Sequence, residues 1–430
     1  MHNSPSPTSP TPDIRGESRF LSRRVRGIKL APTIAMSERA ARMRDAGSDV
    51  ISLAVGELDF DTPASVIEVA HVAAKRGYTR YTAPDGAPPV KDAVRTKIAR
   101  DNGFAFERNE IHVASGCKQV IHNAFAATLD PGDEVVILAP SWVSYIEMVE
   151  FCGGTPVVVE TRPEQGFLPT PDALRAELGP RTKWLLLNSP NNPTGAIYPA
   201  SLLADIAAII AEHPHAMVLS DEIYEHLAFD GLRHVSMLEA APHLRSRILI
   251  VNGVSKSYAM TGWRIGFGAG PEWLIEAMGR VQSQTAGSSN SIAQAAAAAA
   301  MMGDQSDLPR WRETLQRRRD IAIDILRGSN RLGVARPAGA FYIYADVSRC
   351  IGAWTAAGKS LADDVAVTEF ILESAHVATV PGAAFAMSPF VRLSFALDEV
   401  RVAEACRRIV AALNTLEGPS ERIGAPGETA

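Results

Sequence analysis

Short apolar runs rich in β-forming residues alternate with longer helical segments from about residue 63 to residue 310. This alternation is typical of a mostly parallel sheet covered by helices on both faces. The clearest strand candidates are residues 134–138, 184–188, 217–220 and 248–251, and polar residues follow these runs. Because ligands of open α/β sheets bind beyond the carboxyl ends of the strands, we expect the functional residues at these polar ends.

The chain has 430 residues, more than one hydrophobic core usually organises, so we expect two domains. Beyond about residue 310 the alternation gives way to a basic helical segment and then to short strand-like segments, which predicts a smaller α+β domain. The expected parts are a disordered N-terminal tail rich in Ser, Pro and Thr (1–20), an N-terminal arm that is also part of the small domain (21–62), a large domain (63–318) and the small C-terminal domain (319–430).

The composition excludes several classes of protein. A formal net charge of -5 and a pI near 6.1 provide no general attraction to nucleic acid or to an anionic membrane. No apolar run is long enough to cross a bilayer, and we expect a cytoplasmic protein. An organelle transit peptide stays open as an alternative, because five arginines lie between residues 15 and 26. The cysteines are scattered at Cys117, Cys152, Cys350 and Cys406, a pattern that suggests neither disulfides nor a metal site.

A lysine follows the predicted strand 248–251 and is itself followed by an arginine. Lys256 lies in the run Ser-Lys-Ser-Tyr-Ala-Met-Thr-Gly-Trp-Arg, which ends at Arg264. A lysine amine can form an imine with an aldehyde cofactor, and the planar guanidinium of Arg264 suits a phosphate. A lone Ser-Lys pair would favour a solvated loop, so this interpretation depends on the other segments.

Polar residues after the two neighbouring strands provide further groups. Asp221 follows the run 217–220, and such a carboxylate is either a helix cap or the partner of a protonated pyridine nitrogen. Tyr224 and Asn192 could both donate to a phenolate oxygen on the same ring. Taken alone, the segment 188–195, which contains Asn192, would be only a turn.

Two glycine-containing segments have patterns that are associated with phosphate binding. Residues 115–119 form a turn of small residues that opens a helix running to residue 129, and a helix N-terminus suits a phosphate. Gly266, Gly268 and Gly270 imitate a dinucleotide-binding fingerprint, but they lie within a strand-like run instead of opening a helix. Close packing is the better explanation for these three glycines.

Taken in this order, the segments resemble those of the class I aminotransferases of fold type I, from about residue 21 to residue 412. The most specific are Ser-Lys…Gly-Trp-Arg, Asn-Asn-Pro-Thr-Gly and Ser-Asp-Glu-Ile-Tyr. The chain looks most like the bacterial and plastid branch of aspartate aminotransferases, some of which also transaminate prephenate. The resemblance implies the α/β fold of the fold type I transferases that depend on pyridoxal phosphate (PLP), with residues 63–318 as the PLP-binding domain.

The resemblance also implies roles at the cofactor. Lys256 matches the lysine that carries PLP as a Schiff base and transfers protons, and Asp221 matches the partner of the pyridinium. Asn192 and Tyr224 match residues that bond the ring oxygen, and Trp142 matches an aromatic residue stacked on the ring. The matching phosphate contacts are Gly116, Cys117, Ser255 and Arg264, with Tyr81 reaching the phosphate of the neighbouring subunit. A homodimer with shared active sites is therefore implied.

Substrate contacts follow from the same resemblance. Arg392 matches the arginine that binds the substrate α-carboxylate, with Gly56, Trp142 and Asn192 beside it, and Lys29, Thr33 and Lys118 match residues that recognise a distal carboxylate. Taken alone, Arg392 would be interpreted as a solvated surface residue, because it alternates with apolar neighbours. The chain departs from the family pattern at Leu58, where proline is usual, and at Cys117, where Gly or Ala is usual. We expect the first to alter a loop over the substrate and the second to crowd the phosphate turn.

The expected activity is a ping-pong transamination in which aspartate or glutamate exchanges its amino group with 2-oxoglutarate or oxaloacetate, with prephenate as a further acceptor. The alternative within the fold is a C–S lyase or an enzyme like aminocyclopropanecarboxylate synthase, because these use the same cofactor residues. A transcription regulator would need a DNA-binding module, for which the segment before Leu21 is too short. Lys256 and Asp221 argue against a PLP-binding protein without catalysis.

Overall fold

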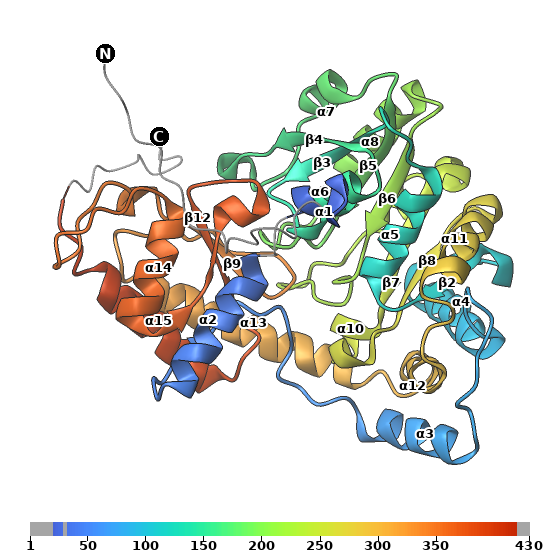
Figure 1. Ribbon diagram of the computed structural model, residues 1–430, viewed down its shortest axis with the longest axis horizontal. Helices are drawn as coiled ribbons and strands as arrows, with labels where there is room; N and C mark the ends of the chain where they lie inside the picture. Colours follow the sequence, from blue (N-terminus) through green and yellow to red (C-terminus); the bar gives the residue numbers. More distant parts are fainter. Residues whose placement is uncertain (1–19, 29–31, 419–430) are drawn as a thin grey trace.

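The computed structural model describes residues 20–28 and 32–418, which form two groups of elements (Figure 1). The larger group contains the elements from α3 to α12. The smaller group contains the C-terminal elements together with α2 (Pro32–Asp45). The expected N-terminal tail lies outside the described residues apart from Phe20, as do residues 29–31 and 419–430.

The larger group is built on a seven-stranded sheet in the order β2, β8, β7, β6, β5, β3, β4. The strands from β3 to β7 run parallel, whereas β8 is antiparallel to both β7 and β2, so the expected mostly parallel sheet is confirmed. The bounds are β2 (Ile111–Ala114), β3 (Glu134–Ala139), β4 (Thr155–Glu160), β5 (Thr182–Asn188), β6 (Met217–Asp221), β7 (Ile248–Gly253) and β8 (Gly266–Ala269).

Helices cover both faces of this sheet because consecutive strand residues are apolar, so that each face of a strand presents apolar side chains. Val135 and Ile137 of β3 pack into one core with helices α5 (Cys117–Thr128), α6 (Ser144–Phe151) and α11 (Glu272–Thr285). Val136 and Leu138 belong to the core on the other face. The helices there are α3 (Ala64–Lys75), α4 (Pro88–Asn102), α7 (Pro171–Glu177), α8 (Ala200–Glu212), α9 (Met237–Ala240) and α12 (Ser291–Met302).

The glycines of β8 allow α5 to lie close to the sheet. A Cβ at Gly266 would collide with the backbone nitrogen of Cys117, and a Cβ at Gly268 would lie 3.0 Å from a methyl group of Val120. Close packing therefore explains both glycines, as expected. It also brings the N-terminus of α5 close to the carboxyl end of β7, which pairs with Gly266.

The smaller group is an antiparallel sheet packed against helices, in the order β11, β12, β9. A two-stranded parallel pair of β1 and β10 lies beside it, so the N-terminal and C-terminal segments share one core. The bounds are β1 (Ile51–Ser52), β9 (Tyr342–Asp346), β10 (Val377–Ala378), β11 (Val380–Pro381), β12 (Phe390–Ser394), α13 (Asp307–Leu326), α14 (Asp364–Ala375) and α15 (Glu399–Leu413).

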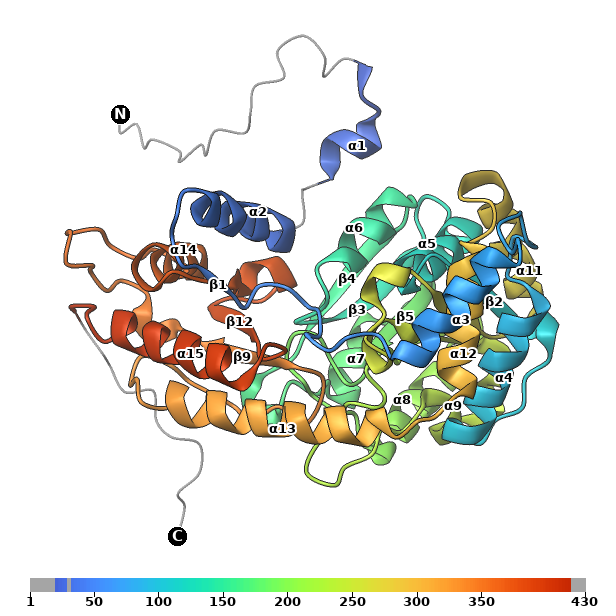
Figure 2. The same ribbon diagram turned by 90° about the horizontal axis from the view of Figure 1, so that it is seen from below.

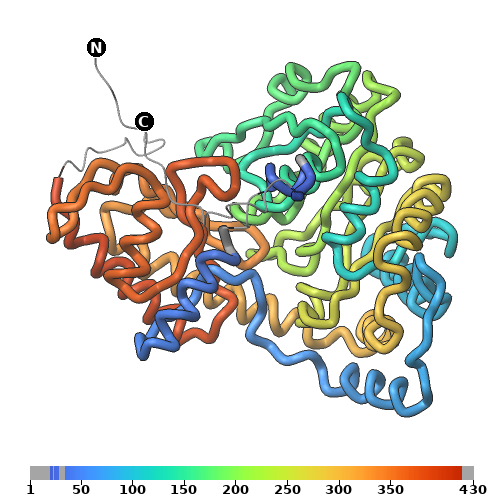
Figure 3. Tube along the Cα trace, in the orientation of Figure 1, coloured from blue at the N-terminus to red at the C-terminus, as the bar shows by residue number. Residues whose placement is uncertain are grey.

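Two segments connect the groups. Residues 53–63 leave β1 of the smaller group and cross to α3, as the tube in Figure 3 shows. Helix α13 extends along both groups in Figure 2, so the boundary expected after residue 318 falls inside a continuous helix and stays a prediction. The short helix α1 (Arg23–Gly27) lies near α6. No helix within residues 20–28 and 32–418 has the length and apolar character that crossing a bilayer requires.

A buried arginine of α13 anchors the larger group to this helix. Arg319 is fully buried and donates to both carboxylate oxygens of Asp230, at 2.7 and 2.8 Å. It also donates to Asp320 at 2.8 Å and to the carbonyl of Pro337 at 3.1 Å. A buried guanidinium that is removed from water needs such acceptors to compensate its charge, so we expect Asp230 to stabilise the folded protein.

We therefore expect Asp230→Ala to lower the free energy of unfolding by about 2 kcal/mol or more, because it leaves buried charge on Arg319 less compensated. Urea denaturation followed by circular dichroism measures this loss. The matched control is Glu239→Ala, which removes the partner of the exposed Arg233 (2.8 Å) and should cost at most about 1 kcal/mol. Equal losses in the two variants would contradict the role of Asp230.

Candidate active site

The carboxyl ends of three neighbouring strands meet at one cavity. Asn188 at the end of β5 pairs in register with Asp221 at the end of β6, and the chain leaves β7 directly into α10 (Val254–Ser257), which contains Lys256. The cavity has a volume of about 570 Å³ and lies between the two groups of elements. The predicted site residues that line it are Gly56, Cys117, Lys118, Trp142, Asn192, Asp221, Tyr224, Ser255, Lys256, Arg264 and Arg392.

Lys256 is held in this cavity with its amine on a backbone carbonyl. Its Nζ donates to the carbonyl oxygen of Gly56 at 2.5 Å. Burial lowers the pKa of Lys256 to about 8, and the positive charges of Arg264 and Arg392 act in the same direction. The amine therefore loses its proton more readily than an exposed lysine does, which suits a nucleophile or a base.

Asp221 is a buried carboxylate, only 3% exposed. The hydroxyl of Tyr145 donates to its Oδ2 at 2.7 Å and the backbone N–H of Ile223 donates to its Oδ1 at 3.3 Å. Burial raises the pKa of Asp221 to about 6, so a cationic partner would find an acceptor with little competing water. Our sequence analysis did not identify Tyr145. The available signal was its position three residues after Trp142, whose ring it meets edge to face at 5.2 Å.

The N-terminus of α5 forms the other end of the cavity. Gly116 precedes the helix with φ +86°, and a Cβ there would lie 2.5 Å from Nη2 of Arg264, so the turn and this guanidinium are in direct contact. Arg264 itself has φ +55°, which is uncommon for a residue with a side chain. Free backbone N–H groups, a guanidinium and the nearby Lys118 together make an anion-binding end.

Cys117 turns its thiol toward the sheet. Its Sγ donates to the carbonyl oxygen of Asn252 at 3.2 Å, and it lies over Gly253, where a Cβ would come within 3.2 Å of the sulfur. Burial raises the pKa of the thiol far above its usual value, so the group is a protonated donor here. The sulfur thus fits between α5 and β7, and crowding of the phosphate turn stays a prediction.

Leu58 lies in the loop between β1 and α3, and the alteration of this loop that its departure from the family pattern implies stays a prediction. Its side chain is buried in the core of the smaller group. The next two residues are also fixed. Asp59 accepts two hydrogen bonds from Arg318, at 2.6 and 3.0 Å, and the ring of Phe60 stacks on that of Trp311, with 5.2 Å between the ring centres. The loop is therefore held by its own side chains at this position.

Arg392 is buried, at 2% exposure, so its interpretation as a solvated surface residue is wrong. Its Nη1 donates to Oδ1 of Asn192 at 3.1 Å and its Nη2 donates to the carbonyl oxygen of Ala54 at 2.6 Å. The guanidinium carbon lies 4.5 Å from the ring centre of Tyr342 and 4.9 Å from that of Phe385. Its Nε finds no partner among the described residues, so a charged donor is available in the cavity.

Tyr224 also lines the cavity, and its hydroxyl lies 3.0 Å from the hydroxyl of Tyr342. Tyr342 was not predicted as a site residue, although it lies in one of the short strand-like segments expected beyond residue 310. Nothing in the local pattern distinguishes it from a core tyrosine, because its neighbours in the site come from distant segments.

Three predicted residues are not brought into the cavity by the described side chains. Tyr81 is 98% exposed and points away from this chain's core. Thr33 lies on α2, but its side chain is not among those described, and Lys29 lies outside the described residues. Lys118 lies at the rim, with its Nζ 5.0 Å above the ring centre of Trp142.

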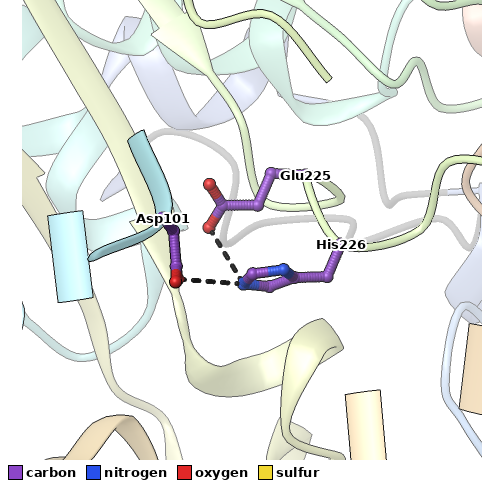
Figure 4. Close-up of side chains that lie close together, drawn as sticks. All are labelled: Asp101, Glu225 and His226. Atoms are coloured by element: carbon purple, nitrogen blue, oxygen red, sulfur yellow. Dashed lines mark ion pairs between the residues drawn. The ribbon is translucent and has the colours of Figure 1, made fainter. Parts of the chain in front are cut away.

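A separate group of side chains has the composition of a metal site. Asp101, Glu225 and His226 converge in Figure 4, with the Nε2 atom of His226 3.4 Å from Asp101 and 3.5 Å from Glu225. The ammonium of Lys97 already forms ion pairs with both carboxylates. The positive charge that the buried carboxylate of Glu225 requires is thus supplied by the protein itself, and the same ammonium pairs with the more exposed Asp101.

Comparisons with known proteins agree with this geometry. Residues 48–409 match the family of class I and II aminotransferases. The chain is 46% identical to an aspartate aminotransferase of Rhizobium meliloti over 393 residues, which cover 91% of this chain and 96% of the relative. It is also 46% identical to an aspartate/prephenate aminotransferase of Cereibacter sphaeroides, over 91% of this chain and 98% of the relative.

Solved structures give the same result. The crystal structure of the aspartate aminotransferase from Rhizobium meliloti superposes with a TM-score of 0.89 and 45% identity, covering 92% of this chain and 99% of the other. The aspartate aminotransferase from Thermus thermophilus with maleate superposes with a TM-score of 0.85 and 43% identity, covering 91% and 99%. Over nearly its whole length, in sequence and in structure, the chain belongs to the family of class I and II aminotransferases.

Proposed function

We propose that this protein is a PLP-dependent aminotransferase that transfers the amino group of aspartate or glutamate to a 2-oxo acid by a ping-pong mechanism, with prephenate as a further acceptor. The observation that carries the proposal is one cavity that contains a lysine of lowered pKa, a buried carboxylate and a buried arginine. The relatives at 42–46% identity that are called aspartate or aspartate/prephenate aminotransferases support it.

The residues present fit PLP at both of its ends. The anion-binding end suits the phosphate: Gly116 and Cys117 at the start of α5, with Ser255 and Arg264. The carboxylate of Asp221 suits the pyridine nitrogen, and the ring of Trp142 suits the ring face. When bound, the group supplies an electron-withdrawing ring conjugated to the substrate α-carbon.

The protein's own residues then divide the remaining work. Lys256 would hold the cofactor through Nζ, and its neutral amine would take the substrate α-proton and return it. Asp221 keeps the proton on the ring nitrogen through its negative charge. Because Oδ1 of Asn192 accepts from Arg392, its Nδ2 is left to donate to the ring oxygen beside the hydroxyl of Tyr224.

The substrate is fixed at its two ends. Arg392 has a free Nε and is oriented by Asn192, Ala54 and two rings, so it suits the α-carboxylate, with Gly56 beside it. We propose Lys118, with Lys29 and Thr33, for a distal carboxylate. Burial and the charge of Arg264 lower the pKa of Lys118. A bound anion would stabilise the charged form of this lysine. The relative solved with maleate, a four-carbon dicarboxylate, supports this assignment.

We further propose a cytoplasmic homodimer in which Tyr81 reaches the phosphate of the neighbouring subunit. Tyr81 is almost fully exposed, and large apolar side chains near it in sequence, Ile67 and Val69 on α3, are also exposed. Large aromatic and aliphatic side chains left exposed on one stretch of the chain favour a surface that a partner covers.

The test of the proposed function is a panel of amino donors and 2-oxo acid acceptors that includes prephenate. We expect aspartate and glutamate to give the highest kcat/KM as donors, with the 2-oxo acid formed in proportion to the amino acid consumed. The same panel decides the alternative: release of ammonia, a thiol or a cyclised product without an acceptor would identify a lyase or an aminocyclopropanecarboxylate-synthase-like enzyme.

The pKa of Lys256 predicts how the apoenzyme captures PLP. Only the neutral amine attacks an aldehyde, and its fraction rises with pH up to the pKa of about 8. We expect the capture rate to rise about tenfold per pH unit below pH 8 and to level off above it. Stopped-flow absorbance with excess PLP measures this rate. Lys256→Ala is the control and should bind PLP without this pH-dependent phase; a wild-type rate independent of pH would contradict the prediction.

Lys118→Ala tests the distal carboxylate. It should lower kcat/KM for aspartate and glutamate by about 2 kcal/mol or more, the scale for removing one member of a desolvated charge pair, and should affect alanine less. Lys183→Ala, which removes an exposed lysine paired with Asp133, is the matched control and should leave every substrate unchanged. If Lys118→Ala slows aspartate and alanine equally while weakening PLP binding, the lysine serves the cofactor instead.

A further inference from the structure

Tyr342 lies where the two ends of the site meet. It is on β9 of the smaller group, its side chain is 1% exposed, and it lines the cavity. Its hydroxyl lies 3.0 Å from the hydroxyl of Tyr224, which comes from the segment after β6 in the larger group. This hydrogen bond connects the two groups of elements inside the cavity, as does the one from Arg392 to Asn192.

The ring of Tyr342 supports the arginine. The guanidinium carbon of Arg392 lies 4.5 Å from its ring centre, with Phe385 at 4.9 Å. These two rings fix the guanidinium, while Asn192 and the carbonyl of Ala54 accept from its two terminal nitrogens. Cation–π contact of a desolvated guanidinium is a favourable interaction that depends on the ring and not on the hydroxyl.

The hydroxyl of Tyr342 also abuts the segment that holds the lysine. A Cβ at Gly56 would collide with this hydroxyl, and the carbonyl of the same glycine accepts from Nζ of Lys256. Glycine is therefore required at position 56 because the phenol occupies the space of a side chain. Three predicted site residues, Gly56, Tyr224 and Arg392, contact one residue for which no role was predicted.

A tyrosine with only a packing role has different surroundings, and the same strand provides an example. Tyr344 lies two residues farther along β9, and its hydroxyl donates to the backbone carbonyl of Met387 at 2.7 Å. The hydroxyl of Tyr342 instead meets the side chain of another site residue. The two tyrosines thus make a matched pair. The hydroxyl of Tyr344 forms its hydrogen bond within the smaller group, and that of Tyr342 forms one with a residue of the larger group.

We propose that Tyr342 is a positioning residue that orients Arg392 with its ring and the proton of Tyr224 with its hydroxyl. A phenol has a single proton. When the hydroxyl of Tyr342 donates a hydrogen bond to the oxygen of Tyr224, the O–H of Tyr224 remains available to donate to the ring oxygen of the cofactor. This inference rests on the proposed function, since it assigns that oxygen to Tyr224.

The first test separates the hydroxyl from the ring. Tyr342→Phe keeps the ring and removes the donor, so donation by Tyr224 weakens and the bound cofactor takes up a proton more easily. We expect the midpoint of its pH-dependent absorption change to rise by about 0.3 to 1 pH unit. Binding of maleate, measured by calorimetry, should stay within about twofold of wild type because the ring still faces Arg392.

The second test removes the ring. Tyr342→Leu should weaken maleate binding by about twofold to thirtyfold and also raise the absorption midpoint. A double-mutant cycle completes the set: in a Tyr224→Phe background, Tyr342→Phe should cause no further shift of the midpoint. Tyr344→Phe, the matched control, should leave both the midpoint and maleate binding unchanged.

Several results would overturn the inference. An unchanged midpoint in Tyr342→Phe would remove the role of the hydroxyl, and unchanged maleate binding in Tyr342→Leu would remove the role of the ring. Equal shifts in Tyr342→Phe and Tyr344→Phe would mean that β9 acts only through packing. Failure of the proposed function is distinguishable, because wild-type protein would then show neither the cofactor absorption nor transamination of aspartate.

Discussion

Removal of charge from water is the constraint on which the rest of this structure depends. Lys256, Asp221 and Arg392 are all withdrawn from solvent in one cavity, and a buried ion is costly unless other groups take the place of water. Here Gly56 accepts from the lysine and Tyr145 donates to the aspartate. The same withdrawal that costs stability moves the pKa values of the lysine and the aspartate toward neutrality, where proton transfer is useful.

The two cores share the task of building this cavity. The carboxyl edge of the seven-stranded sheet provides Asp221 and Lys256, and the antiparallel sheet of the smaller group provides Arg392 and Tyr342. The crossing segment that contains Gly56 lies between them. Neither core contains the cavity alone, so the contacts between the cores fix the distance between the two ends of a bound substrate.

Local sequence patterns were sufficient for the residues that follow strands. Asp221 and Lys256 come directly after buried apolar runs, so periodicity alone brought them to one edge of the sheet. Arg392 could not be placed in this way, because alternation along β12 predicts an exposed face, whereas every residue of that strand is buried and two rings lie against the guanidinium. Its assignment came from family resemblance. Tyr145 and Tyr342 were missed because a local sequence pattern does not distinguish them from tyrosines of the hydrophobic core. The partners of their hydroxyl groups come from segments that are distant in the sequence.

Two of the acceptors that hold the site's cations are backbone carbonyls of one short segment. Ala54 accepts from Arg392 and Gly56 accepts from Lys256. A carbonyl oxygen belongs to every amino acid, so neither acceptor depends on side-chain chemistry, although the hydroxyl of Tyr342 leaves room only for glycine at position 56. The spacing of the two cations therefore depends on the length of this segment. A residue inserted or deleted between Ala54 and Gly56 would change the distance between the two acceptors, so that they would no longer match the positions of both cations.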